Sequence, residues 1–187
     1  MSITRIDNIL SKEEIDHIED IRLNSETYLH EELGRIQFND IHKSLLPETI
    51  EKLTNIARNV SNLPLVLSHA MIVEYSGLYG NPNLRAHVDR DTNELIINMQ
   101  LESNTVWEIG LNLETYDLSD NSALIFNANK ETHWRVHKEF KEGEYVRMMF
   151  IRFYNPEEIS DYSHLPHHPN DEMFKEVSEF RDSLGVF

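Results

Sequence analysis

The residues RAHVD (85–89) lie shortly before the stretch ELIINMQL (94–101), and these two segments indicate the architecture most directly. In the second stretch every other residue is apolar: Leu95, Ile97, Met99 and Leu101. An alternation with a period of two predicts a β-strand with one face in the core. The other face carries Asn98 and Gln100, which either meet solvent or line a polar cavity.

Further short segments of the same kind follow along the chain. They are apolar or alternating, and turn-prone clusters separate them. The segments span residues 65–75, 106–113, 122–127 and 145–154. Short strands at this spacing predict a β-sandwich or a β-barrel.

Helical signals flank this β-rich part. Ser11 and Glu14 match a capping box, and apolar residues at roughly helical spacing follow them. Pro47 is a favoured residue for the first turn of a second helix. A final helix is expected after Asn170. The pattern predicts a mainly β protein with helices before the β-core and one helix after it.

Length and composition limit the classes of function. A chain of 187 residues suits one domain, so we expect a single domain over residues 1–187 with its β-core at about 65–155. The net charge of −16 disfavours intact nucleic acid and anionic membranes as partners, because both need clustered Lys and Arg. The absence of cysteine excludes disulfides and thiolate zinc sites. Without an apolar leader or a run of membrane-spanning length, we expect a cytoplasmic protein.

His87 and Asp89 are candidate metal ligands. Residues two apart on an extended segment point the same way, so this imidazole and this carboxylate can reach one ion. Two histidines and one carboxylate suit Fe(II) and leave coordination positions open for oxygen. A His-x-Asp pair is common by chance, and in isolation it indicates no more than a surface turn. The neighbouring motifs in the sequence distinguish a metal site from a surface turn.

Four features follow one another along the chain. They are a strand ending at Tyr75, the His-x-Asp pair, the run His133-Trp134-Arg135, and Arg147 near the start of the last strand. In this order and spacing the chain resembles the 2-oxoglutarate/Fe(II)-dependent dioxygenase superfamily, and most closely its prolyl-hydroxylase-like branch. The resemblance covers roughly residues 65–154 and implies a double-stranded β-helix (jelly-roll) core.

The resemblance implies a set of metal ligands. His87 and Asp89 match the first two ligands of Fe(II), and His133 matches the third, distal one. His137 remains an alternative third ligand, because it precedes Arg147 by ten residues, a spacing found in many relatives.

The resemblance also implies a site for 2-oxoglutarate. Arg147 matches the residue whose planar guanidinium pairs with the far carboxylate of this co-substrate, and Arg135 remains an alternative. Tyr75 matches a tyrosine that supports the same carboxylate, and Asn98 and Gln100 are candidates to line the pocket. Arg152, five positions after Arg147, would face the other side of a regular strand, so we expect it on the surface or in the second sheet.

The implied activity is that of an Fe(II)- and 2-oxoglutarate-dependent oxygenase. It would use O2, release succinate and CO2, and hydroxylate a small-molecule or peptidyl substrate. Related halogenases lack the carboxylate ligand, so Asp89 favours hydroxylation or demethylation. Neither the substrate nor the oligomeric state is readable from the sequence. Two other hypotheses remain: a cupin-like metal enzyme that does not use 2-oxoglutarate, and a non-catalytic jelly-roll binding module.

Overall fold

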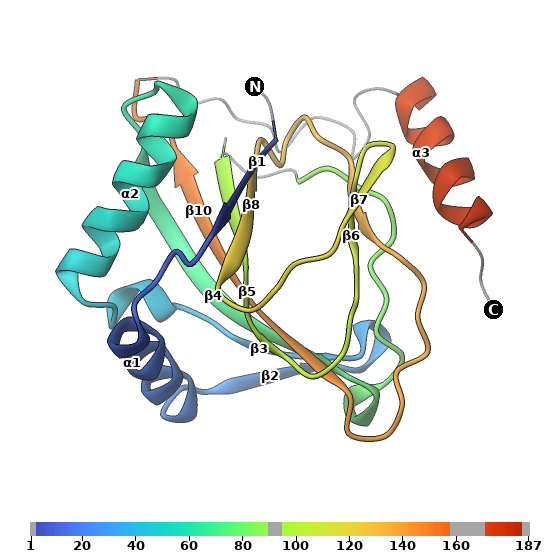
Figure 1. Cartoon of the computed structure of the whole chain (residues 1–187), viewed down its shortest axis with the longest axis horizontal. Helices are drawn as coiled ribbons and strands as arrows, with labels where there is room; N and C mark the ends of the chain where they lie inside the picture. The colour runs from blue at the N-terminus through green and yellow to red at the C-terminus, as the bar shows by residue number, and fades with distance from the viewer. Residues whose placement is uncertain (1–2, 90–94, 158–170, 185–187) are drawn as a thin grey trace.

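Two antiparallel sheets form the body of the protein (Figure 1). The computed structural model describes residues 3–89, 95–157 and 171–184. The larger sheet has the order β1 (Thr4–Asp7), β8 (Ser122–Phe126), β5 (Leu95–Ser103), β10 (Tyr145–Tyr154), β4 (Val66–Ser76), β3 (Arg35–Phe38) and β2 (Thr27–His30). The smaller sheet has the order β7 (Glu114–Tyr116), β6 (Ile109–Leu111) and β9 (His133–Arg135). The predicted double-stranded β-helix core is confirmed.

Two helices cover the outer face of the larger sheet, α1 (Lys12–Leu23) and α2 (Pro47–Ser61) (Figure 1). The predicted capping box is present: the Ser11 hydroxyl accepts from the Glu14 amide, and the Glu14 carboxylate accepts from the Ser11 amide. The apolar residues of both helices pack into one buried cluster with the sheet, as Leu53 does with Ile151. Burial of this face is the main force that holds the helices in place.

The third helix, α3 (Asp171–Ser183), lies beside the smaller sheet (Figure 1). Val177 is fully buried and belongs to a small cluster with Trp134 and Ala86. Three 3-10 helices complete the described elements: η1 (Glu31–Leu33), η2 (Ile41–Lys43) and η3 (Gly77–Tyr79). Within the described ranges, no helix combines the length and the hydrophobicity needed to cross a bilayer.

The central strands are buried on both faces. In β5, Ile97 and Met99 pack against the helices, whereas Ile96 belongs to the cluster between the sheets. Asn98 shares this inner face and is only 4% exposed. The polar side of the strand therefore faces the interior of the β-helix and not solvent.

The inner face of β10 follows the same alternation. Met149 and Ile151 pack under the helices, and Met148 lies in the cluster between the sheets. Phe150 and Arg152 share the inner side with Met148 and line a cavity there. This cavity between the two sheets holds the site described next.

Candidate metal centre

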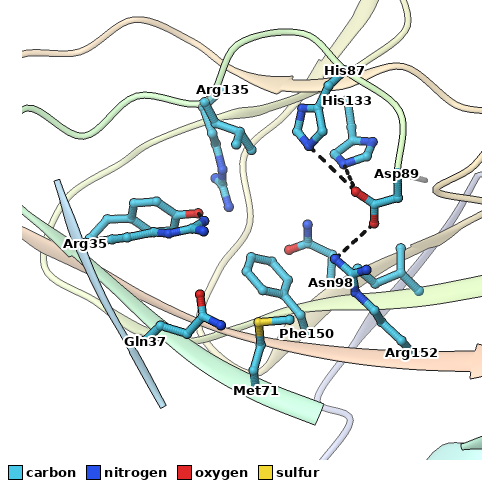
Figure 2. Close-up of a pocket in the computed structure, with 13 residues that line it drawn as sticks. Arg35, Gln37, Met71, His87, Asp89, Asn98, His133, Arg135, Phe150 and Arg152 are labelled. Carbon is cyan, nitrogen blue, oxygen red and sulfur yellow. Dashed lines mark hydrogen bonds and ion pairs between the residues drawn. The ribbon is translucent and has the colours of Figure 1, made fainter. Parts of the chain in front are cut away.

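His87, Asp89 and His133 converge at one side of the inner cavity (Figure 2). Nε2 of His87 lies 3.7 Å from Oδ1 of Asp89, and Nε2 of His133 lies 3.6 Å from the same oxygen. The three ligand atoms lie within 4.8 Å of one another. These separations exceed normal hydrogen-bond lengths, and the three atoms are near enough to one another that they could hold one metal ion.

Backbone pairing brings the three residues together. The His87 amide donates to the His133 carbonyl at 3.1 Å, and the His133 amide donates to the His87 carbonyl at 2.9 Å. The Asp89 amide donates to the carbonyl of Ala128 at 2.8 Å. The segment with the His-x-Asp pair thus runs antiparallel beside β9, and the side chains meet although they are far apart in the sequence.

Each histidine is oriented through its other ring nitrogen. Nδ1 of His87 lies 2.8 Å from the carbonyl oxygen of Arg85, and Nδ1 of His133 lies 3.1 Å from that of Glu131. A carbonyl oxygen only accepts, so Nδ1 carries the hydrogen in each ring. When the ring is neutral, Nε2 therefore holds the lone pair, which is the form that binds a metal.

The carboxylate of Asp89 is held in its ionised form. Burial alone would raise its pKa, but the interactions with His133, Arg152 and His87 outweigh burial and lower the pKa well below its usual value. Two imidazole nitrogens and one ionised carboxylate are a donor set that suits a divalent metal such as Fe(II). The residues present therefore fit the metal that the sequence indicates.

His133, and not His137, joins the His-x-Asp pair. Among the described residues, the cluster with metal-ligand spacing contains His87, Asp89 and His133. His133 is buried on β9, whereas His137 follows that strand and does not line the cavity.

Three arginines line the cavity, which has a volume of about 220 Å³. Arg35 enters from β3, Arg135 from β9 and Arg152 from β10 (Figure 2). Asp89 is the one acidic residue among the described residues of the lining. The cavity interior is therefore cationic, although the whole chain has a net charge of −16.

Arg135 carries a donor that has no partner among the described residues. The residue is 2% exposed; one terminal nitrogen donates to the carbonyl of Trp107, whereas the other, NH2, is buried and meets no hydrogen-bond acceptor in the part of the chain that the structure describes. The guanidinium also lies over the Trp107 ring, 4.8 Å from its centroid. Burial lowers the pKa of Arg135 to about 10. A buried, incompletely paired cation is costly, so this end of the cavity favours an anion.

Tyr75 and Asn98 also line the cavity, whereas Gln100 does not and donates to the carbonyl of Leu118. The Tyr75 hydroxyl accepts a hydrogen bond from Arg35 at 3.2 Å, and its ring packs edge-on against Trp107. The buried Oδ1 of Asn98 has no hydrogen-bond partner within residues 3–89, 95–157 and 171–184. Both side chains are positioned to meet a polar ligand in the cavity.

Arg147, which the sequence assigned to 2-oxoglutarate, does not line the cavity. It forms ion pairs with Glu74 and Glu102, both at 2.6 Å, and with Glu19 of α1 at 3.3 Å. Side chains alternate along β10, so Arg147 shares the face of Met149 that packs toward the helices. The expectation that Arg152 faces away from Arg147 was right, but Arg152 is the one that points inward.

Arg35 and Arg152 line the cavity but were not predicted from the sequence as site residues. Arg35 lies on β3, a short strand with no motif of its own. The sequence did hold a signal for Arg152, because this residue lies an even number of positions from Met148 and Phe150, which face inward. Both faces of this strand are apolar, however, so the sequence did not reveal which one is internal.

Comparisons with known proteins bear on the fold. No family model and no curated protein matches the sequence. HygX from Streptomyces hygroscopicus, solved with nickel and 2-oxoglutarate bound, matches with a TM-score of 0.61 and 9% identity over 82% of this chain and 83% of that chain.

Two further solved structures match in the same way. The viral collagen prolyl hydroxylase of Paramecium Bursaria Chlorella virus-1, a 2-oxoglutarate complex, gives a TM-score of 0.58 and 13% identity over 82% of this chain and 95% of that chain. The α-ketoglutarate-dependent epimerase SnoN from nogalamycin biosynthesis gives a TM-score of 0.63 and 12% identity over 88% of this chain and 82% of that chain. The chain has the same fold as these proteins.

Proposed function

We propose that this chain, which has the double-stranded β-helix fold of the 2-oxoglutarate/Fe(II) oxygenases, is an Fe(II)- and 2-oxoglutarate-dependent oxygenase that hydroxylates its substrate. One observation carries the proposal: a cluster with the donor set for Fe(II) and a buried, incompletely paired guanidinium line the same cavity. A 2-oxo dicarboxylate has a chelating end that suits a metal in the cluster and a far carboxylate that suits the guanidinium.

Arg135 is the proposed partner of the far carboxylate of 2-oxoglutarate. Its unpaired NH2 can donate to this group, and a carboxylate within the cavity would offset the cost of burying the cation. Tyr75, which Arg35 holds through its hydroxyl, is proposed to support the same carboxylate. Asn98 is proposed to contact the co-substrate between its two ends. Arg135 thus takes the role that the sequence pattern suggested for Arg147.

His87, Asp89 and His133 are proposed to hold the metal. Fe(II), when bound, would supply the activation of O2 that is coupled to conversion of 2-oxoglutarate into succinate and CO2. The two histidines present Nε2 because backbone carbonyls accept from Nδ1, and Asp89 stays ionised. Apolar side chains such as Met71 and Phe150 line the same cavity and limit its water content.

Hydroxylation is the proposed outcome because Asp89 supplies the carboxylate ligand that related halogenases lack. The structural neighbours include an epimerase and a carbocyclase, so the outcome has to be measured directly. A small-molecule substrate is favoured over a peptidyl one. HygX and SnoN have been solved with hygromycin B and nogalamycin RO, respectively.

A thermal-shift assay separates this proposal from its alternatives. Mn(II) should raise the melting temperature, and 2-oxoglutarate should raise it further only when Mn(II) is present, because a ligand of the folded state stabilises it. A cupin-like enzyme would respond to the metal alone, and a non-catalytic binding module to neither. Asp89→Ala is the control, and its melting temperature should not change with either addition.

A further inference from the structure

We infer that Arg152 is a positioning residue that holds one oxygen of Asp89, so that this carboxylate meets the metal through its other oxygen alone. The inference rests on the proposed function, because it requires a metal at the His87, Asp89 and His133 cluster. It assigns a role to an inward side chain that the sequence pattern placed elsewhere.

The two oxygens of Asp89 face different partners. Oδ1 is the oxygen near Nε2 of both histidines, at 3.7 and 3.6 Å. Oδ2 points away from them and forms an ion pair with NH2 of Arg152 at 3.0 Å (Figure 2). Oδ2 is buried and, among the described residues, meets no donor with hydrogen-bond geometry, so it is held by charge attraction in the ion pair with Arg152.

The two histidines also use one side-chain atom toward the cluster and hold the other through an outer contact. In each histidine the nitrogen remote from the cluster contacts a backbone carbonyl, which fixes the ring. Arg152 does for Asp89 what these carbonyls do for the histidines. Such outer contacts orient metal ligands and tune their donor strength.

Holding Oδ2 has a consequence for coordination number. A carboxylate can bind a metal through one oxygen or through both. Two histidines and a one-oxygen carboxylate leave three of six octahedral positions open. If Asp89 turned to use both oxygens, one open position would be lost, and the proposed chemistry needs them all. Such a turn would break the ion pair between Arg152 and Oδ2, so Arg152 opposes it.

Arg147 provides a matched control on the same strand. Like Arg152 it pairs with carboxylates, but it lies on the opposite face and contacts Glu74, Glu102 and Glu19, none of which lines the cavity. Replacing it should lower stability without changing coordination. A difference between the two substitutions therefore reports on the contact with Asp89 and not on the loss of an arginine from β10.

The test counts the water molecules on bound Mn(II). Broadening of the Mn(II) electron paramagnetic resonance lines in 17O-enriched water measures this number without any turnover. We expect three waters in the parent protein and in Arg147→Met, and two in Arg152→Met. Arg152→Lys keeps a cationic donor, so it should restore the third water.

The outcomes are distinguishable. Three waters in Arg152→Met would overturn the inference and leave the metal site intact. If Arg152→Met binds no Mn(II), the Arg152→Lys variant provides the test. Three waters on Mn(II) in Arg152→Lys would support the inference. Absence of Mn(II) binding in Arg152→Lys would overturn it and assign Arg152 a purely structural role. Failure of the parent protein to bind Mn(II) would instead overturn the metal site and with it the proposed function.

Discussion

Replacing Arg135 with methionine should weaken binding of 2-oxoglutarate by about 10²- to 10³-fold. Arg135 is 2% exposed and has a buried, unpaired NH2. Removing one partner of a buried charge pair costs about 3–5 kcal/mol, because the remaining charge is left uncompensated. With about 1.4 kcal/mol for each factor of ten in affinity, the lower part of this range corresponds to the stated loss.

Calorimetric titration of 2-oxoglutarate into the Mn(II)-loaded protein measures this loss directly. Methionine retains much of the packing against the Trp107 ring, and circular dichroism checks that the variant is folded. Arg147→Met is the matched control and should bind 2-oxoglutarate like the parent. Loss of binding in Arg147→Met together with unchanged binding in Arg135→Met would refute the role of Arg135 and support the sequence-based assignment to Arg147.

Three further predictions concern stability and the metal. As pH falls below about 4, the ordinary pKa of an aspartate, the metal-free protein should lose the stability that ionised Asp89 provides, because the pKa of Asp89 is lowered in the folded state. The free energy of unfolding in urea should therefore fall less between pH 5 and pH 3 in Asp89→Asn than in the parent. An equal fall in the two proteins would count against this prediction. Gly110→Ala should cost about 1–3 kcal/mol, since a Cβ there would lie 2.0 Å from the Trp134 ring; an unchanged urea midpoint would contradict it. Ser11→Ala should cost about 1 kcal/mol through loss of the α1 cap, and the urea midpoint of Ser11→Thr, which keeps the hydroxyl, is the comparison.

The convergence of His87, Asp89 and His133 was predictable because its signals are local. His87 and Asp89 are two residues apart on an extended segment, and that spacing alone places their side chains on one side. His133 follows a buried strand within a recognisable run. Pairing of the two backbone segments then brings the ligands together. Short-range geometry and a known order of motifs were sufficient.

The arginine that faces the cavity was not predictable, for a physical reason. Strand β10 is apolar on both faces, as Met148 and Met149 show: both are fully buried, but in different clusters. Alternation therefore separates Arg147 from Arg152 without saying which one is internal. That choice depends on where α1 and α2 pack, and this is decided by tertiary contacts far away in the sequence.

Some strand boundaries were also beyond local pattern. Residues 106–113 were predicted as one strand, but only Ile109–Leu111 pairs in the smaller sheet, and Val106 is largely exposed. Strand β2 has no buried residue and was not predicted, because its order comes from pairing with β3 and not from an apolar face. Hydrophobic periodicity reports burial, so it misses strands that pair without being buried.

The central claim is that the cluster of His87, Asp89 and His133 supports oxidation that consumes 2-oxoglutarate. Succinate release from 2-oxoglutarate tests this most directly, with Fe(II), air and pooled small molecules and peptides as candidate substrates. We predict that the parent protein forms succinate and that Asp89→Ala, folded by circular dichroism, does not. Equal succinate formation by the two proteins, or none by the parent with any pool, would contradict the account.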